Sequence, residues 1–402
     1  MTPPNPRSRA RAAAVVAVVA ATALAAGCGG SSTGSGSSSS PAPVHIGLLL
    51  TLSGVYESIG TDARDGFQLY LATHGNRLGG HPVNLSVQDE GATPETAAAA
   101  TQTLLDSHVQ AIAGPVNGVS FEGVVPLTTK AKVPVVGVAA RPDIQGGIGY
   151  VWNVSFMSGD AGTAIAPYIH DHVKGTVYAI GADYQGGWEQ IRGFTNTFTA
   201  LGGKLANSGG NPTFTPFPTT TDFRPYLEMI KASGAKAVYC YFAGQEAIDF
   251  VKQYATSDVS TVPLYASGIV TEGAALKAEG PAAAGITSVL DYSPDVDTAA
   301  NRGFVSAWSA AHGGDQPTVF SMTGYDAAAV LDQAIAKAGP NPSSDAINTA
   351  MGTLGRIDSP RGAWQMAAAN HAPVQKWYLR KVQMDGTALA NVKIEELATI
   401  GG

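Results

Sequence analysis

Short runs of apolar residues, separated by glycine and proline, alternate from residue 44 onward with longer segments of helical periodicity. The run at 45–50 is apolar on both faces, which is typical of a strand buried in a parallel sheet. The segment at about 60–74 repeats apolar residues at helical spacing, and Phe67 and Leu71 are predicted to face the core. Such an alternation of strands and helices predicts an α/β fold with right-handed crossovers.

The same order continues in two series, which a break at 158–162 separates. Thr93 is the predicted cap of one helix, and Pro94 takes its first position. Further strands are predicted at 83–89, 109–113, 133–138, 176–180, 237–241 and 263–266, with further helices from about 93, 120 and 187. The last predicted strands, 363–366 and 374–382, have only a polar turn between them, as in a hairpin. The simplest interpretation is two α/β lobes, one of which the hairpin closes.

The amino terminus has the pattern of a secretory signal. Three arginines precede an apolar run at 12–26, and a run of about 15 residues matches a signal-peptide core rather than a membrane span of ~20 residues. The run ends in small residues before Cys28, and this end resembles the cleavage box of bacterial lipoproteins, with Ala25 where the box usually has leucine. We predict a lipoprotein signal peptide at 1–27 and a lipid on Cys28. The alternative is an ordinary secretory signal followed by an incidental cysteine.

Residues 28–43 consist almost wholly of small and polar residues, a composition that predicts a flexible tether. No later stretch approaches the ~18 uninterrupted apolar residues of a membrane span. The expected location is therefore the extracytoplasmic face of the cell membrane, with the lipid as the only anchor.

Composition narrows the class of protein. A chain of 402 residues with 45% hydrophobic and 14% charged residues can build a real core, which excludes disorder, and a net charge of −7 makes a nucleic-acid partner unexpected. The two cysteines, Cys28 and Cys240, stand in such different contexts that neither a disulfide framework nor a thiolate metal site is expected. Cys240 lies in an apolar run and is predicted to be buried and without a redox role.

Motifs of common enzymes are incomplete in this sequence. The nearest approach to a nucleophile elbow, at 118–122, has Glu122 where the last glycine should stand. A dinucleotide fingerprint that starts at 147–149 has Trp152 in place of its third glycine, and the histidines lack metal-ligand spacing. We therefore expect no catalytic residues, no metal and no cofactor.

Several short segments stand in an order and spacing that together point to one family. They are GLLLTLSGVY at 47–56, AGP at 113–115, VPVV at 133–136, ADYQG at 182–186, YFAG at 241–244, FVKQY at 250–254, YDAA at 325–328 and DSPRG at 358–362. Through them the chain resembles, over residues 44–396, an extracytoplasmic solute-binding protein of the leucine/isoleucine/valine-binding family, which serves ABC importers. The FAG and SPRG stretches look closest to members that bind aromatic or other hydrophobic carboxylates.

The resemblance implies a type I periplasmic-binding fold. Each of its two lobes is a mostly parallel sheet flanked by helices, three chain crossings join the lobes, and the ligand cleft lies between them. Residues 44–157 and 291–356 would form lobe 1, and residues 158–290 and 357–398 would form lobe 2. The implied partners are a small-molecule ligand and the permease and ATPase subunits of an ABC importer, and the implied state is a monomer.

Carried over residue by residue, the resemblance places the ligand against loops that follow the strands of both lobes. The implied binding residues are Tyr56, Asn117, Gly118, Ser120, Ala139, Ala140, Arg141, Tyr184, Phe242 and Gly268. Tyr184 and Phe242 are alternatively core aromatics, and Ser120 is alternatively only a helix cap. Open parallel sheets place ligands at the carboxyl ends of their strands, and backbone N–H groups at helix starts favour a carboxylate there.

Departures from the family pattern bear on the ligand. Amino-acid-binding members commonly hold the ligand carboxylate with a serine where this chain has Gly118, and the ammonium with an acidic residue where this chain has Gly268. Arg141 replaces a threonine, and a cation facing an ammonium is unfavourable. We expect a hydrophobic or aromatic carboxylate paired with Arg141. A slip in the alignment would turn Arg141 outward, and a longer loop would bring in Glu272 as an acidic partner.

Three alternatives remain at this point. An importer receptor with ordinary recognition of a zwitterionic amino acid and a ligand-sensing receptor both keep the two-lobed fold. A secreted α/β enzyme is the alternative from another class, and it lacks an acid, base or nucleophile set in the sequence.

Overall fold

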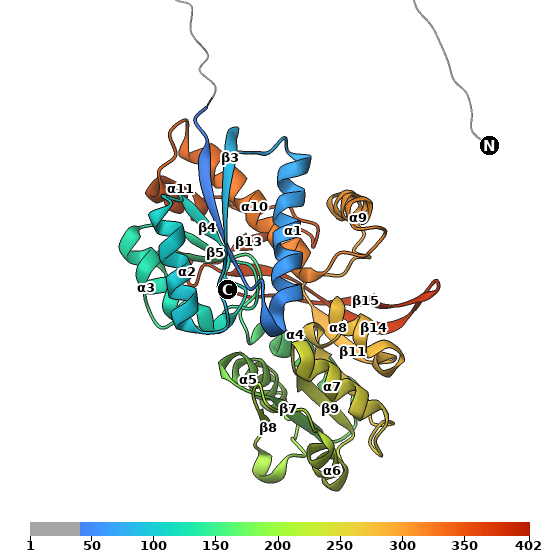
Figure 1. The fold of residues 1–402 in the computed structure, drawn as a ribbon. Coiled ribbons are helices and arrows are strands. Elements are labelled where there is room, and N and C mark those ends of the chain that lie inside the picture. The colour runs from blue at the N-terminus through green and yellow to red at the C-terminus, as the bar shows by residue number, and fades with distance from the viewer. Residues whose placement is uncertain (1–40) are drawn as a thin grey trace, which may run out of the picture. The chain divides into compact units, whose positions relative to one another are not determined.

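A computed structural model describes residues 41–402, whose strands form two sheets flanked by helices (Figure 1). This is the two-lobed α/β architecture that the sequence predicts, with one sheet in each lobe. The sheet of lobe 1 is mostly parallel, as predicted, whereas the sheet of lobe 2 is mixed, because its last four strands, within residues 356–400, join it by antiparallel pairing. The predicted signal peptide and Cys28 lie outside the described residues. Within 41–402, no helix is both long enough and apolar enough to span a membrane.

The sheet of lobe 1 has the strand order β2-β3-β1-β4-β5-β6, and its pairs are parallel except for β2 with β3. Its strands span Val44–Leu50 (β1), Arg77–Leu78 (β2), His81–Asp89 (β3), Ala111–Ala113 (β4), Val135–Gly137 (β5) and Val151–Asn153 (β6). Because successive side chains of a strand point to opposite faces, Leu48 and Leu49 join different apolar clusters on the two sides of the sheet. The apolar run of β1 is thus buried on both faces, as predicted.

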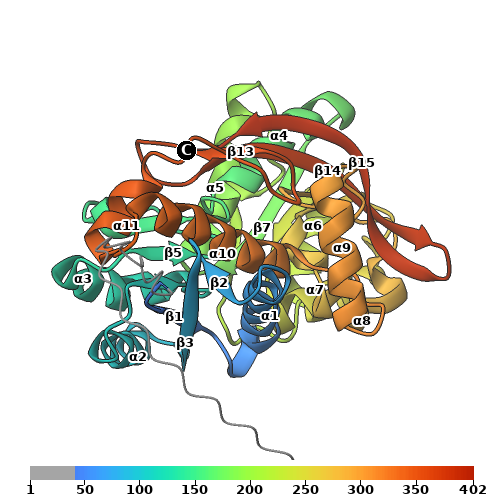
Figure 2. The ribbon, with the colours of Figure 1, turned by 90° about the horizontal axis from the view of Figure 1, so that it is seen from above.

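Helices from both ends of the chain cover lobe 1. They span Glu57–Thr73 (α1), Pro94–Asp106 (α2), Phe121–Ala131 (α3), Ala299–Ala311 (α9), Val319–Ala338 (α10) and Ser344–Met351 (α11). As predicted, Thr93 caps α2, where its hydroxyl accepts from the N–H of Thr96 and Pro94 is the first residue. Helix α10 lies directly beside α1 (Figure 2). A Cβ on Gly66 of α1 would lie 1.9 Å from the carbonyl oxygen of Ser321, so the two backbones touch.

The sheet of lobe 2 has the order β12-β13-β14-β11-β10-β9-β7-β8, with β15 paired to β14. Its strands span Val177–Asp183 (β7), Thr213–Pro216 (β8), Ala237–Tyr241 (β9), Leu264–Ser267 (β10), Thr287–Leu290 (β11), Arg356–Ile357 (β12), Trp364–Met366 (β13), Pro373–Asp385 (β14) and Ala388–Ile400 (β15). Its helices span Asp160–His172 (α4), Gln185–Ala200 (α5), Arg224–Ser233 (α6), Gly244–Ala255 (α7) and Ala274–Glu279 (α8). Cys240 on β9 is fully buried, which confirms its predicted placement.

The tail of the chain contains one long strand that the sequence analysis does not predict. The predicted hairpin of 363–366 and 374–382 is present as β13 and β14, but β14 continues into a second hairpin with β15. Strand β15 pairs only with β14 and is mostly half-exposed or exposed, so its sequence mixes charged and apolar residues without a clean alternation. An edge strand of this kind gives a weak sequence signal.

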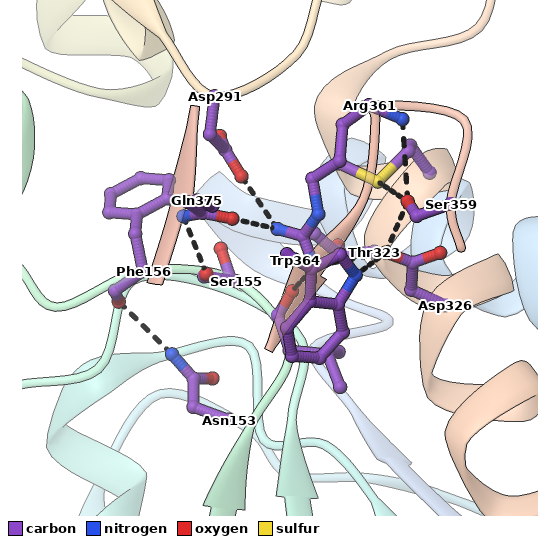
Figure 3. Close-up of polar contacts among 12 residues, drawn as sticks. Asn153, Ser155, Phe156, Asp291, Thr323, Asp326, Ser359, Arg361, Trp364 and Gln375 are labelled. Atoms are coloured by element: carbon purple, nitrogen blue, oxygen red, sulfur yellow. Dashed lines mark hydrogen bonds and ion pairs between the residues drawn. The ribbon is translucent and has the colours of Figure 1, made fainter. Parts of the chain in front are cut away.

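Three segments carry the chain between the two sheets, and a buried arginine contacts parts of them. The segments follow β6, β11 and α11. Arg361, after the last of them, is paired with Asp291 after β11 at 2.8 Å and with Asp326 of α10 at 2.9 Å (Figure 3). Its guanidinium also donates to the carbonyl of Val154, which follows β6, and to the side chain of Gln375 on β14.

All three charged groups of this cluster are buried. Burial raises the pKa of the Asp326 carboxyl to about 6, although Arg361 and the hydroxyl of Ser359 lower it. The guanidinium of Arg361 also lies 4.6 Å from the ring centre of Trp364. Because each charge has lost its water, each depends on the others, and removing one partner leaves an uncompensated charge in the interior.

We expect Arg361→Met to lower the free energy of unfolding by about 3–5 kcal/mol, because Asp291 and Asp326 lose their counter-charge. The loss should be larger at pH 8 than at pH 5. Without the cation the folded-state pKa values of both carboxyls rise further, so the folded state is destabilised as the pH rises and the unfolded carboxyls ionise. Denaturant unfolding at both pH values measures this.

Arg356→Met is the matched control, because Arg356 pairs with Asp358 at the exposed surface of the same crossing. An exposed pair contributes about 0–1 kcal/mol, so this variant should behave nearly as the parent does. An Arg361→Met variant as stable as Arg356→Met would contradict the role given to the buried cluster.

Candidate ligand-binding site

Loops at the carboxyl ends of strands from both lobes enclose a central cavity, as expected for parallel α/β sheets. The lobe 1 residues lining it follow β1, β4 and β5 or begin α10, and the lobe 2 residues follow β6, β7 and β10 or lie at the end of β9 and just after it. The lining consists of Tyr56, Ile59, Val116, Asn117, Gly118, Val119, Ala139, Ala140, Pro142, Ser158, Tyr184, Gln185, Gly186, Tyr241, Ala243, Ile269 and Phe320.

The buried carboxyl group of Glu90 fixes the backbone of the loop after β4. Oε1 of Glu90 accepts hydrogen bonds from the backbone N–H groups of Val116 and Asn117, each at 3.0 Å, and from the hydroxyl of Thr51 at 2.5 Å. Burial raises the pKa of Glu90 to about 7, against the lowering effect of these hydrogen bonds. Glu90 thus fixes the loop from which Gly118 and Val119 reach the cavity.

Three tyrosines from the two lobes meet at one side of the cavity. The hydroxyls of Tyr184 and Tyr241 are 2.9 Å apart, and the ring of Tyr184 lies 4.4 Å from that of Phe217. Tyr56 reaches the same cavity from lobe 1. Burial raises the pKa of all three phenols, so they stay protonated and can donate hydrogen bonds.

Ionised side chains are missing from the described lining of the cavity, which contains no Asp, Glu, Lys, Arg or His. Its polar groups are the tyrosine hydroxyls, the amides of Asn117 and Gln185, the hydroxyl of Ser158, and backbone groups. Nor do the described residues hold a group of three or more His, Cys, Asp or Glu placed to bind a metal. The cavity can therefore bind a ligand through neutral donors and acceptors and through apolar contact.

Six of the residues that the sequence analysis singled out line this cavity together: Tyr56, Asn117, Gly118, Ala139, Ala140 and Tyr184. They come from four separate loops. Tyr184 is half-buried in the apolar core as well as lining the cavity, so its two interpretations do not exclude each other.

The expectation that Arg141 faces the ligand is wrong. Arg141 is buried behind the cavity wall, where its guanidinium donates to the carbonyl of Asn370 and to the sulfur of Met157. Its neighbours Ala140 and Pro142 line the cavity instead. The segment is extended and pairs with Met157, so adjacent side chains point to opposite sides.

Phe242, Gly268 and Ser120 are also corrected, because none of them lines the cavity. Phe242 packs in an aromatic cluster of lobe 2, 4.7 Å from Phe250. A Cβ on Gly268 would lie 2.5 Å from Nη2 of Arg380, so Gly268 gives room to this buried side chain. Ser120 is buried at the start of α3, and its side chain makes no cap hydrogen bond there.

The residues that sequence reasoning missed stand beside those that it named. Tyr241 and Ala243 flank Phe242, and Ile269 follows Gly268. Ile59 and Phe320 begin helices and carry no local signal of their own. Glu90 directly follows the predicted strand at 83–89, and an acidic residue at a buried strand end is a signal that could have been used.

Comparison with known proteins gives a consistent result. A family model described as "Periplasmic binding protein" matches residues 43–387. Leu/Ile/Val-binding protein homolog 6 of Brucella melitensis is 28% identical over 352 residues, which cover 85% of this chain and 88% of that protein.

Solved structures extend the comparison. A solute-binding protein of an ABC transporter from R. palustris, in complex with benzoate, has a TM-score of 0.80 and 30% identity, and the match covers 89% of this chain and 97% of that chain. Another from R. palustris, in complex with 4-hydroxybenzoate, has a TM-score of 0.79 and 28% identity over 88% of this chain and 96% of that chain.

We expect Glu90→Gln to stabilise the protein relative to the parent at pH 8 but not at pH 4.5. The folded parent keeps the Glu90 proton up to about pH 7, whereas the ordinary pKa is 4.5, so the parent loses stability as the pH rises between these values. A neutral glutamine keeps the acceptor oxygen and removes this loss. Denaturant unfolding should show a gain on the order of 1–3 kcal/mol at pH 8.

Glu122→Gln is the control, because Glu122 is an exposed residue of the neighbouring helix α3. Its effect should not change with pH. The role of Glu90 is contradicted if Glu90→Gln differs from the parent by the same amount at both pH values.

Proposed function

Because this chain belongs to the periplasmic binding protein family, we propose that it captures a small aromatic carboxylate between its two lobes. It is a solute-binding protein of an ABC transporter and not an enzyme, and its family works outside the cytoplasm. The chemical class of the ligand is the part that we propose.

The observation that carries the proposal is the neutral lining of the central cavity within the described residues. A carboxylate in such a cavity depends on neutral donors, and the first N–H groups of a helix are suited to it. The three-residue 3-10 helix Gly118–Ser120 lines the cavity with its first two residues, although the N–H of Val119 already donates to Oδ1 of Asn117, and the protonated hydroxyls of Tyr184 and Tyr241 add further donors. Ile59 and Phe320 suit the faces and edges of an aromatic ring.

The relatives support this ligand class. The two R. palustris proteins are in complex with benzoate and with 4-hydroxybenzoate, which are single rings with one carboxylate.

A branched-chain amino acid is the second candidate, and the Brucella homologue supports it. A zwitterion brings an ammonium as well as a carboxylate. No acidic side chain lines the described cavity, so the ammonium would lose its water without gaining a counter-charge. This cost favours the monocarboxylate over the amino acid.

We infer that capture closes lobe 1, residues 44–157 and 291–356, against lobe 2, residues 158–290 and 357–398. The membership of the two sheets supports this division. The lobes approach closely at Gly244, the first residue of α7, where a Cβ would lie 3.0 Å from the carbonyl oxygen of Val55. A larger residue there would hold the lobes apart.

We further propose that Cys28 carries a lipid that anchors the protein to the cell membrane. The sequence around Cys28 and the tether up to residue 43 support this, as does the extracytoplasmic location of the family.

The parent is expected to bind benzoate with a Kd in the micromolar range or tighter and to bind benzamide at least tenfold more weakly, because the amide cannot make charge-assisted hydrogen bonds. Leucine should give no detectable heat under the same conditions. Calorimetric titration with the three compounds measures this, and tight binding of leucine without binding of benzoate would refute the proposed ligand class.

Two glycines provide matched variants for the same titration. Gly244 and Gly234 both have a positive φ, of 58° and 66°, so an alanine is strained at either position. Only Gly244 approaches the other lobe, since a Cβ on Gly234 meets nothing within 4 Å. Gly244→Ala should therefore weaken benzoate binding about tenfold, whereas Gly234→Ala should leave the affinity unchanged.

Cys28→Ala should release the protein from the membrane fraction or leave it unprocessed, because the thiol is the site of lipid attachment. Cys240→Ala is the control and should remain with the membrane, since Cys240 is buried in lobe 2. Fractionation with mass spectrometry of the amino terminus measures both. Membrane retention of a fully processed Cys28→Ala chain would show that the lipid proposal is mistaken.

A further inference from the structure

A second cavity adjoins the central one, and we call it the side pocket. Its volume is about 380 Å³, and it lies between the start of α1 in lobe 1 and helices α7 and α8 in lobe 2. Its wall includes Ser58, Ile248, Ala274 and Ala275, none of which lines the central cavity. The side pocket is therefore a separate space beside the site proposed for the ligand.

Three apolar side chains line both cavities and so separate them: Ile59, Ile269 and Phe320. We call them the partition. They come from three elements, namely α1, the 3-10 helix Gly268–Thr271 and α10. Ile269 and Phe320 are only 6% and 5% exposed, so they fill the boundary between the two spaces.

The backbone that carries the partition is held from both lobes. The N–H of Val319, next to Phe320, donates to Glu272 of lobe 2 at 2.8 Å. The hydroxyl of Thr318 donates to Asp62 of α1, also at 2.8 Å. Beside Ile269, the carbonyl of Gly268 accepts from Arg380 at 3.2 Å. Because these contacts fix the main chain, opening the boundary requires smaller side chains.

We propose that Ile59, Ile269 and Phe320 set the length of the ligand. They form an apolar boundary of the central cavity, and in the proposed binding mode they exclude aryl carboxylates that carry a second ring or a chain opposite the carboxylate. Shortening a partition side chain joins the central cavity to the side pocket, where Ile248, Ala274 and Ala275 offer apolar contact to the extension beside the polar Ser58, Gln245 and Glu272. This inference rests on the proposed aromatic-carboxylate function and names its specificity-determining residues.

The test is calorimetric titration of the parent, Phe320→Ala and Ile269→Ala with benzoate and with biphenyl-4-carboxylate. The parent should bind benzoate and bind the biphenyl acid at least a hundredfold more weakly. Each partition variant should gain at least tenfold in affinity for the biphenyl acid while losing no more than about tenfold for benzoate. Ile59→Ala is a third variant at a partly exposed position, where folding is least at risk.

Ile248→Ala is the matched control, because Ile248 lines the side pocket but not the central cavity. It enlarges the side pocket without opening the partition, so it should gain nothing for the biphenyl acid. A parent that binds both acids equally, or partition variants that bind benzoate without any gain for the longer acid, would overturn this inference alone. A parent that binds neither acid would overturn the proposed function and this inference with it.

Discussion

The two lobes depend on one buried guanidinium. Arg361 has charged or polar partners on segments that leave both sheets, and Asp291 and Asp326 have no other cation within hydrogen-bond distance among the described residues. A charge that has lost its water is tolerated only where its partners are held in place, so the cluster ties the crossings to one another. The cavity takes its walls from both lobes, and its shape therefore depends on a contact that does not touch it.

Charged side chains are distributed unevenly between the buried cluster around Arg361 and the central cavity. Arg141, Arg361 and Arg380 are all buried, yet each is directed to carbonyls or carboxylates of the framework. The cavity, as far as its described residues go, contains only dipoles and hydroxyls. Dipoles fixed by the backbone need little reorganisation when an anion enters, and they leave an ammonium without a counter-charge. In the proposed function, selection between ligand classes then follows from the absence of charged side chains in the described lining as much as from its hydrogen-bond donors.

The sequence analysis locates strands and loops, but it does not predict which side chains of a loop face the cavity, because successive side chains of an extended chain point in opposite directions. Strand β9 at 237–241 is predicted with its observed ends, because apolar runs report burial directly. The sequence analysis also finds the loops that form the site. At Arg141 and Phe242, however, the neighbouring residues line the cavity, because a shift of one residue along an extended chain reverses the direction of the side chain. Contacts such as that between Glu90 and the loop after β4 join residues far apart in the sequence, so no local pattern contains them.

The close packing of α1 against α10 has a consequence for the order in which the protein is made. Asp332 of α10 accepts hydrogen bonds from the hydroxyl of Tyr70 and the N–H of Gly79, so elements from the beginning and the end of the chain complete one another. On the ribosome, α1 is synthesised some two hundred and fifty residues before its partner. A nascent chain that has not reached α10 leaves an apolar face of lobe 1 uncovered, and this lobe cannot complete its core until most of the polypeptide has emerged.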